Sequence, residues 1–241
     1  MKVLSIGNSF SQDAQRYLYG IARADGVKMK NVNLYIGGCT LERHYRNMLS
    51  EDKAYDFEIN GIKTGIKISL KEALLSDEWD YITIQQQSLR SCDYDTFEPY
   101  LQALAEYARK YSPKVKILMM RTWGYKEASN KLTVDAGYPT HRDMFEDIRK
   151  AYAIAEEKIG AAYTIPLGDA VAMATELGAK DIHRDEFHMS LGFGRYLIGL
   201  VFYEKLTGRS VADNTFRDFD KEVTEEDIAL AKKIAEAVRD R

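Results

Sequence analysis

Two short segments at opposite ends of the chain carry residue types that work together in acyl-transfer chemistry. G7-N-S-F10 follows an apolar run and places Ser9 where that run ends, and D185-E-F-H188 places an acid three positions before a histidine. On a turn, that spacing lets the Asp185 carboxylate meet His188 Nδ1 and leaves Nε2 free as a base. The three residues predict a nucleophile, a base and an orienting acid. Each segment alone also fits a simpler role, as a helix cap or a surface turn.

Other residues offer alternatives for these roles. His183 lies near Asp185, but as the base it would sit on a loop running in the wrong sense for that acid to support it. His44 either lines a pocket or packs through its ring, and His141 is expected to face solvent. Cys39 has no activating partner that the sequence assigns, which favours a packing role over a nucleophilic one.

Apolar runs and helical patterns alternate along the chain, which predicts a single three-layer α/β domain over residues 1–241 with parallel strands. Five strand-like runs are expected, at 3–6, 31–36, 81–84, 115–120 and 163–165. Helical patterns occupy 12–24, 41–49, 71–75, 97–111, 142–159, 168–178, 191–206 and 225–239. Residues 55–70 break the alternation, because two β-rich runs flank Asn60-Gly61 and Gly65 and indicate a hairpin insertion.

Polar or glycine-bearing loops follow the strands and should meet at one edge of the sheet, where open α/β folds bind ligands. Ser9 follows the first strand and Gly38 the second. Gln85 and Gln86 follow the third strand, and the segment ending at His188 follows the fifth. Backbone N–H groups of Ser9 and Gly38 could stabilise a developing oxyanion, with a glutamine carboxamide as the third donor. Glycine at position 38 removes a side chain that would obstruct a substrate.

Taken in order, these segments resemble the SGNH hydrolases, the GDSL-type esterase and lipase superfamily. G7-N-S-F10 is similar to the first block, with Asn8 where many members have Asp, Gly38 lies in a match to the second block, and D185-E-F-H188 is similar to the fifth. The resemblance spans nearly the whole chain and implies a three-layer, flavodoxin-like fold with a five-stranded parallel sheet. It also implies that Ser9 is the nucleophile, that His188 is the base and then the acid, and that Asp185 orients His188.

The third block departs from the superfamily pattern of a glycine followed by an asparagine. The segment W79-D-Y-I-T-I-Q-Q-Q-S88 resembles a bacterial branch of unknown function, in which Q-Q-x-S stands at this place. The third oxyanion donor is therefore expected to be Gln86, with Gln85 as the alternative. Alternation along a strand points these two side chains to opposite faces, so only one should reach the site unless the strand has already ended before them.

The same branch has a T-W-x-Y element, which T122-W-G-Y125 matches in this chain. Trp123 and Tyr125 lie in the long loop 121–139, which is long enough to act as a lid. Both are expected at a substrate site, where aromatic rings stack on a sugar or an acyl group. The alternative is that they hold the loop in place by burial, and we expect one residue in each role.

The resemblance implies a serine esterase that forms an acyl-enzyme and uses no metal or organic cofactor. Many relatives remove acetyl or other small acyl groups from carbohydrates, so the expected substrate is a small-molecule or glycan ester. A lipid or thioester hydrolase is the alternative within the enzyme class, and a non-catalytic carbohydrate-binding module is the alternative outside it. A flavodoxin-like nucleotide binder is disfavoured, because G7-N-S-F10 is too short for a phosphate-binding glycine loop.

The overall composition excludes several other classes of protein. A formal net charge of -3 over 241 residues gives neither a basic footprint for nucleic acid nor a polybasic patch for a membrane. Cys39 and Cys92 are expected to be reduced, and their spacing is not that of a metal site. With no apolar leader ahead of the first strand, the chain is expected to be cytoplasmic.

Overall fold

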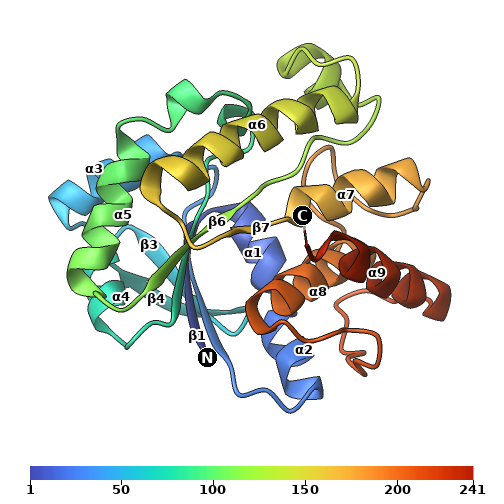
Figure 1. Ribbon diagram of the computed structural model, residues 1–241, viewed down its shortest axis with the longest axis horizontal. Coiled ribbons are helices and arrows are strands. Elements are labelled where there is room, and N and C mark those ends of the chain that lie inside the picture. The colour runs from blue at the N-terminus through green and yellow to red at the C-terminus, as the bar shows by residue number, and fades with distance from the viewer. Residues whose placement is uncertain (241) are drawn as a thin grey trace.

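A mostly parallel β-sheet runs through the centre of the molecule (Figure 1). The computed structural model describes residues 1–240, and within them the sheet has seven strands. They are β1 (Lys2–Gly7), β2 (Lys30–Tyr35), β3 (Tyr55–Ile59), β4 (Ile62–Ile68), β5 (Tyr81–Ile84), β6 (Lys116–Met120) and β7 (Thr164–Ile165). The order is β4-β3-β2-β1-β5-β6-β7, and β2, β1, β5, β6 and β7 are mutually parallel. These are the five parallel strands that the sequence predicts.

The remaining two strands, β3 and β4, form an antiparallel hairpin within residues 55–70, where the sequence indicates one. The hairpin pairs with β2 and so extends the parallel sheet at one edge. Asn60 and Gly61 form its two-residue turn, with φ angles of 53° and 76°. Positive φ at both central residues defines the type I′ turn, which Asn-Gly favours.

Helices cover both faces of the sheet and complete an α/β/α sandwich (Figure 1). One face is covered by α1 (Ser9–Gln15), α2 (Leu18–Ala24), α7 (Leu167–Glu176), α8 (Phe193–Thr207) and α9 (Glu225–Val238). The other is covered by α3 (Leu41–Ser50), α4 (Leu70–Leu75), α5 (Tyr100–Tyr111) and α6 (His141–Ile159). Short turns of helix occur at η1 (Leu89–Cys92), η2 (Tyr94–Thr96) and η3 (Lys131–Asp135). The single helix expected over 12–24 is therefore two helices, and the break between them lets the Tyr17 ring pack against Phe216.

The sheet has a separate hydrophobic core on each face. Leu4 and Ile6 of β1 point into the core beneath α3 to α6, whereas Val3 points into the core beneath α8 and α9. All three side chains are fully buried. Burial on both faces explains why β1 reads as a nearly continuous apolar run, as is typical of a central parallel strand.

The interface between α1 and the sheet contains a layer of buried polar side chains beside the apolar Phe10 and Ala14. Gln15 Nε2 donates to Ser5 Oγ on β1 at 2.5 Å, and Ser11 Oγ donates to Asn33 Oδ1 on β2 at 2.6 Å. Asn33 Nδ2 in turn donates to Glu58 Oε2 on β3 at 2.8 Å. All five of these polar residues are buried, so their hydrogen bonds fix α1 at one position over the sheet. Since α1 begins at Ser9, this polar layer also fixes the place of that hydroxyl.

None of the helices within residues 1–240 is long and apolar enough to cross a membrane.

Candidate active site

Ser9, His188 and Asp185 form a continuous chain of hydrogen bonds at the carboxyl edge of the sheet. His188 Nε2 lies 2.9 Å from Ser9 Oγ, although the two residues are 179 positions apart. His188 Nδ1 lies 2.7 Å from Asp185 Oδ2. The proximity expected from the sequence is therefore present, and both imidazole nitrogens are engaged in the order that a general base requires.

The turn between β1 and α1 holds Ser9 at the end of the sheet. β1 ends at Gly7, and Asn8 caps α1 by accepting a hydrogen bond from the Phe10 N–H at 3.0 Å. A Cβ atom on Gly7 would lie 2.3 Å from Ser11 Oγ, so only glycine fits beneath the first turn. Ser9 is the first helical residue, and its N–H is one of those that a helix leaves without an internal partner.

The Asp185 carboxylate is held by its own loop. Its Oδ1 accepts hydrogen bonds from the backbone N–H groups of Phe187 at 2.9 Å and His188 at 2.7 Å. Partial burial alone would raise the pKa of Asp185, but these hydrogen bonds and the one from the His188 ring outweigh burial and lower that pKa. Asp185 is therefore ionised beside His188 at neutral pH.

A buried carboxylate on α1, Asp13, ties the His188 loop (residues 183–189) to the Ser9 helix. Asp13 is fully buried and accepts hydrogen bonds from Arg184 Nη1 at 2.9 Å and Arg195 Nε at 2.8 Å. It also accepts the Met189 N–H at 3.1 Å. Asp13 is not among the residues predicted from the sequence. The only sequence feature that connects it with the site is its position one helical turn after Ser9.

Trp123 supports the His188 loop from beneath. Its ring stacks on Phe10, with centroids 4.0 Å apart and planes 2° apart, and its Nε1 donates to the Phe187 carbonyl at 2.8 Å. Phe187 in turn packs against the His188 ring at 4.1 Å. Trp123 is fully buried and is not in the wall of the cavity at Ser9, so its expected role as a substrate contact is wrong. It holds its loop in place instead, and it also holds Phe187.

A cavity of about 300 Å³ opens above Ser9 and His188. Its wall also contains Tyr125, whose hydroxyl lies 2.9 Å from Ser88 Oγ. The full set of lining residues is Asn8, Ser9, Phe10, Tyr35, Gly37, Gly38, Gln87, Ser88, Tyr125, Lys131, Phe187 and His188. Of the two aromatic residues predicted for the site, Tyr125 therefore lies in its wall and Trp123 lies behind it.

Gly38 lies in the turn after β2 and lines the same cavity as Phe187 and His188 of the His188 loop. The Cys39 N–H donates to the Ile36 carbonyl at 3.2 Å, and Gly38 has a φ of +60°. That conformation favours glycine, and a Cβ there would meet only open space. Within residues 1–240, the N–H groups of Ser9 and Gly38 donate no hydrogen bond, so both are available to a ligand.

Gln85 and Gln86 do not line the cavity, contrary to the expectation from sequence. Gln86 Oε1 accepts the Leu41 N–H at 3.0 Å, and its Nε2 donates to the Thr96 carbonyl at 2.8 Å. Gln85 Nε2 donates to Asn8 Oδ1 at 2.8 Å. Both amides therefore connect loops to each other. Gln86, which the sequence favours as the third oxyanion donor, has its amide nitrogen directed to Thr96 and not to the cavity.

The next two residues of that loop take the place expected for Gln86. Gln87 and Ser88 both line the cavity, and Gln87 Nε2 donates to Ser88 Oγ at 3.2 Å. A carboxamide nitrogen carries two hydrogens, so a second one remains on Gln87. The Q-Q-x-S pattern specifies Ser88 but leaves position 87 open, so of these two residues only Ser88 had a signal in the sequence.

His44, His141 and Cys39 are buried, and His183 is partly exposed. His44 stacks on Tyr55, and burial lowers the pKa of His44 to about 3, which settles its two alternatives in favour of packing. Burial also lowers the pKa of His183 to about 3, so it is a poor base. His141 is 2% exposed rather than solvent-facing, because its Nδ1 bonds the Tyr125 carbonyl at 2.8 Å. Burial raises the pKa of the Cys39 thiol to about 12, which fits a packing residue.

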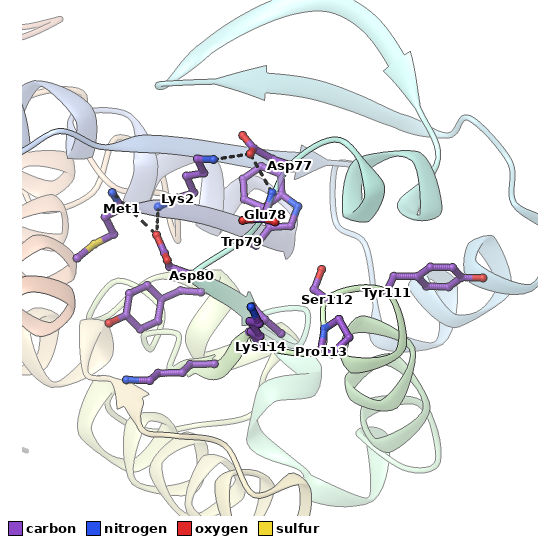
Figure 2. A pocket seen from close by; sticks show the side chains of 13 residues that line it. Met1, Lys2, Asp77, Glu78, Trp79, Asp80, Tyr111, Ser112, Pro113 and Lys114 are labelled. Carbon is purple, nitrogen blue, oxygen red and sulfur yellow. Dashed lines mark hydrogen bonds and ion pairs between the residues drawn. The ribbon is translucent and has the colours of Figure 1, made fainter.

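A larger cavity, of about 750 Å³, lies at the opposite edge of the sheet, by the amino ends of β1, β5 and β6 (Figure 2). Two of its acidic side chains, Asp77 and Asp80, already have hydrogen-bond partners. Asp77 bonds Lys2 Nζ at 2.6 Å and Lys30 Nζ at 2.8 Å, and Asp80 accepts the Lys2 N–H at 2.7 Å. Size alone would select this cavity, but the chemistry of Ser9 and His188 lies at the other edge.

Within residues 1–240, no cluster of three or more His, Cys, Asp or Glu side chains is arranged to hold a metal ion.

The fold is that of the SGNH hydrolases, as comparison with solved structures shows. A candidate SGNH hydrolase from Slackia heliotrinireducens superimposes with a TM-score of 0.61 at 22% identity, covering 85% of this chain and 97% of that one. Axe2, an acetylxylan esterase from Geobacillus stearothermophilus, gives 0.56 at 18% identity, covering 86% of this chain and 94% of that one. At these identities the likeness establishes the shared fold.

Within that fold, the chain belongs to the family described as "Domain of unknown function (DUF4886)", whose model matches residues 2–238. A crystal structure of a DUF4886 family protein from Bacteroides uniformis has a TM-score of 0.89 at 32% identity. The match covers 98% of this chain and 93% of that one. No curated protein matches this chain significantly. The family is thus a branch of the SGNH hydrolase fold, as the Q-Q-x-S resemblance indicated.

Proposed function

We propose that this protein is a serine esterase that removes small acyl groups, above all acetyl, from carbohydrate esters. The observation that carries the proposal is the hydrogen-bonded chain from Ser9 Oγ through His188 to Asp185, with links of 2.9 and 2.7 Å. A pure binding module needs none of this arrangement, and the shared SGNH fold agrees with a hydrolase.

In the proposed mechanism, Ser9 Oγ attacks the ester carbonyl while His188 Nε2 takes its proton. Asp185 stays ionised and stabilises the imidazolium that forms. The N–H groups of Ser9 and Gly38 donate to the oxyanion, and we assign the third donor to the Gln87 carboxamide. His188 then gives the proton to the departing alcohol, which leaves an acyl group on Ser9. Water, deprotonated by the same His188, releases the acid and restores the hydroxyl.

The size of the cavity supports a small acyl group. Its volume of about 300 Å³ is at the lower end of the range for ligand pockets. Tyr35 and Phe187 in its wall are partly exposed aromatic rings of the kind that pack against sugars, whereas the Tyr125 ring is 1% exposed. The acetylxylan esterase among the solved structures of the same fold adds a precedent for acetylated glycans.

A steady-state assay with p-nitrophenyl esters and acetylated xylan tests the proposal. We expect the wild-type protein to hydrolyse the acetate faster than the octanoate and to release acetate from the glycan. Ser9→Ala should lower kcat by about 10⁴-fold or more, as for loss of a triad nucleophile. Ser50→Ala, at an exposed serine ending α3, is the matched control and should behave as wild type. Equal rates for Ser9→Ala and wild type would overturn the proposal, and rates that rise with acyl length would favour a lipid esterase.

A further inference from the structure

Asn8 forms hydrogen bonds with three of the loops that meet at the cavity beside Ser9. Its Oδ1 accepts the Phe10 N–H at 3.0 Å and Gln85 Nε2 at 2.8 Å, and its Nδ2 donates to the Cys39 carbonyl at 3.1 Å. These partners follow β1, β5 and β2 respectively. Asn8 is only 2% exposed, so its hydrogen bonds form away from bulk water, where an unsatisfied partner is expensive.

The orientation of the Asn8 amide follows from its partners. The Phe10 backbone N–H can only donate, so the oxygen of the amide must face it. The Cys39 carbonyl can only accept, so the nitrogen must face that carbonyl. Position 8 therefore requires an acceptor and a donor on the same side chain, and among short side chains asparagine supplies both.

The Cys39 contact fixes the turn that presents the Gly38 N–H. The Cys39 N–H closes this turn onto the Ile36 carbonyl at 3.2 Å, and its own carbonyl is held by Asn8. The turn that contains Gly38 is thus tied to the residue directly before Ser9, and both Gly38 and Ser9 line the cavity.

We infer that Asn8 is a positioning residue, which uses its amide to hold the Gly38 N–H in register with Ser9 for the tetrahedral intermediate. This inference rests on the proposed esterase function. It explains why position 8 is asparagine where many superfamily members have aspartate. In this chain, an aspartate oxygen in place of Asn8 Nδ2 would lie 3.1 Å from the Cys39 carbonyl oxygen, and both oxygens are acceptors. Asn8 touches no reacting atom in this role and acts through the turn.

Asn8→Asp and Asn8→Ser test the inference, because both replacements keep a good helix cap. The aspartate has no donor for the Cys39 carbonyl, and the single serine oxygen cannot replace the separate oxygen and nitrogen with which the amide reaches Phe10 and Cys39. We expect kcat for p-nitrophenyl acetate to fall by about 10- to 100-fold, since the loss of a whole oxyanion donor lowers it by about 10²- to 10³-fold. KM should stay within about threefold, because the ground-state ester does not use this geometry. The inhibition constant of phenylboronic acid, which forms a tetrahedral adduct with an active serine, should rise by the same factor as kcat falls.

Asn214→Ser is the matched control. Asn214, between α8 and α9, is a buried asparagine outside the cavity lining whose Nδ2 donates to the Ile21 carbonyl at 2.9 Å and whose Oδ1 accepts the Phe216 N–H at 3.1 Å. The variant should lower the thermal midpoint and leave kcat and the boronate inhibition constant unchanged.

The outcomes separate the two proposals. Wild-type hydrolysis that does not depend on Ser9 would overturn the proposed function and this inference together. Hydrolysis that depends on Ser9, with unchanged kcat and boronate inhibition in both Asn8 variants, would overturn the inference alone. Loss of native circular dichroism in both Asn8 variants would also overturn it, because Asn8 would then act through folding.

Discussion

Replacement of Trp123 by phenylalanine separates support of the His188 loop from contact with substrate. Phenylalanine keeps an aromatic ring for the stack on Phe10 at 4.0 Å but removes the Nε1 hydrogen that the Phe187 carbonyl accepts at 2.8 Å. A net hydrogen bond contributes about 0.5–1.5 kcal/mol, and a buried acceptor left without a partner costs about 1–3 kcal/mol. We therefore expect the free energy of unfolding to fall by about 1–2 kcal/mol.

Trp123→Phe should also impair catalysis, by a free energy comparable to its effect on stability. Phe187 precedes His188 and packs on its ring at 4.1 Å, so a shifted Phe187 displaces the imidazole relative to Ser9. Small misplacements of reacting groups can lower rates by about 10²-fold, and we expect kcat to fall by about 10- to 100-fold. KM should change little, because Trp123 lies behind the cavity wall.

Urea unfolding and steady-state kinetics with p-nitrophenyl acetate measure both quantities on the same preparation. Tyr125→Phe is the companion variant, because it removes a hydroxyl from the cavity wall and should act mainly on KM for acetylated sugars. A raised KM with unchanged kcat in Trp123→Phe would refute the reasoning and restore Trp123 as a substrate contact.

Two further predictions concern the third oxyanion donor and a buried acid on α8. Gln87→Ala should lower kcat by about 100-fold with little change in thermal midpoint. Gln86→Ala should instead lower the midpoint, and the reverse pattern in thermal and kinetic assays would favour Gln86 as the donor. Burial of Glu204, which is 1% exposed, raises its pKa from 4.5 to about 7. Between these two pH values the native state keeps a proton that the unfolded chain releases. The free energy of unfolding therefore falls as pH rises through this range, by about 3 kcal/mol at most. In urea titrations, Glu204→Gln should match wild type at pH 4 and be more stable at pH 8, and an equal difference at both values would contradict this sign.

The sequence predicts the parts of the site that depend on topology. Parallel strands place their carboxyl ends together, so the order of elements alone brings Ser9 and His188 to one edge across 179 positions. The D-x-x-H spacing is local, and the turn it forms follows from the hydrogen bonds that Asp185 accepts from its own loop. Neither the proximity of Ser9 and His188 nor the Asp185 turn depends on knowing the path of a long loop.

The sequence fails where one loop residue decides which way a side chain points. β5 ends at Ile84, and beyond it the alternation used to choose between Gln85 and Gln86 no longer applies. The amides of Gln85 and Gln86 form hydrogen bonds with neighbouring loops, and Gln87 lines the cavity instead. The burial of His141 also escapes prediction, because its partner is a backbone carbonyl in the long loop, whose path has no periodic signature.

The most direct test of the central claim is mass spectrometry of the protein after reaction with a fluorophosphonate, which labels an activated serine. The account predicts one adduct, on the peptide that contains Ser9, and a reaction at least about 100-fold slower in His188→Ala, because the 2.9 Å contact with Nε2 activates the hydroxyl. No adduct on Ser9, or equal labelling without His188, would contradict the account.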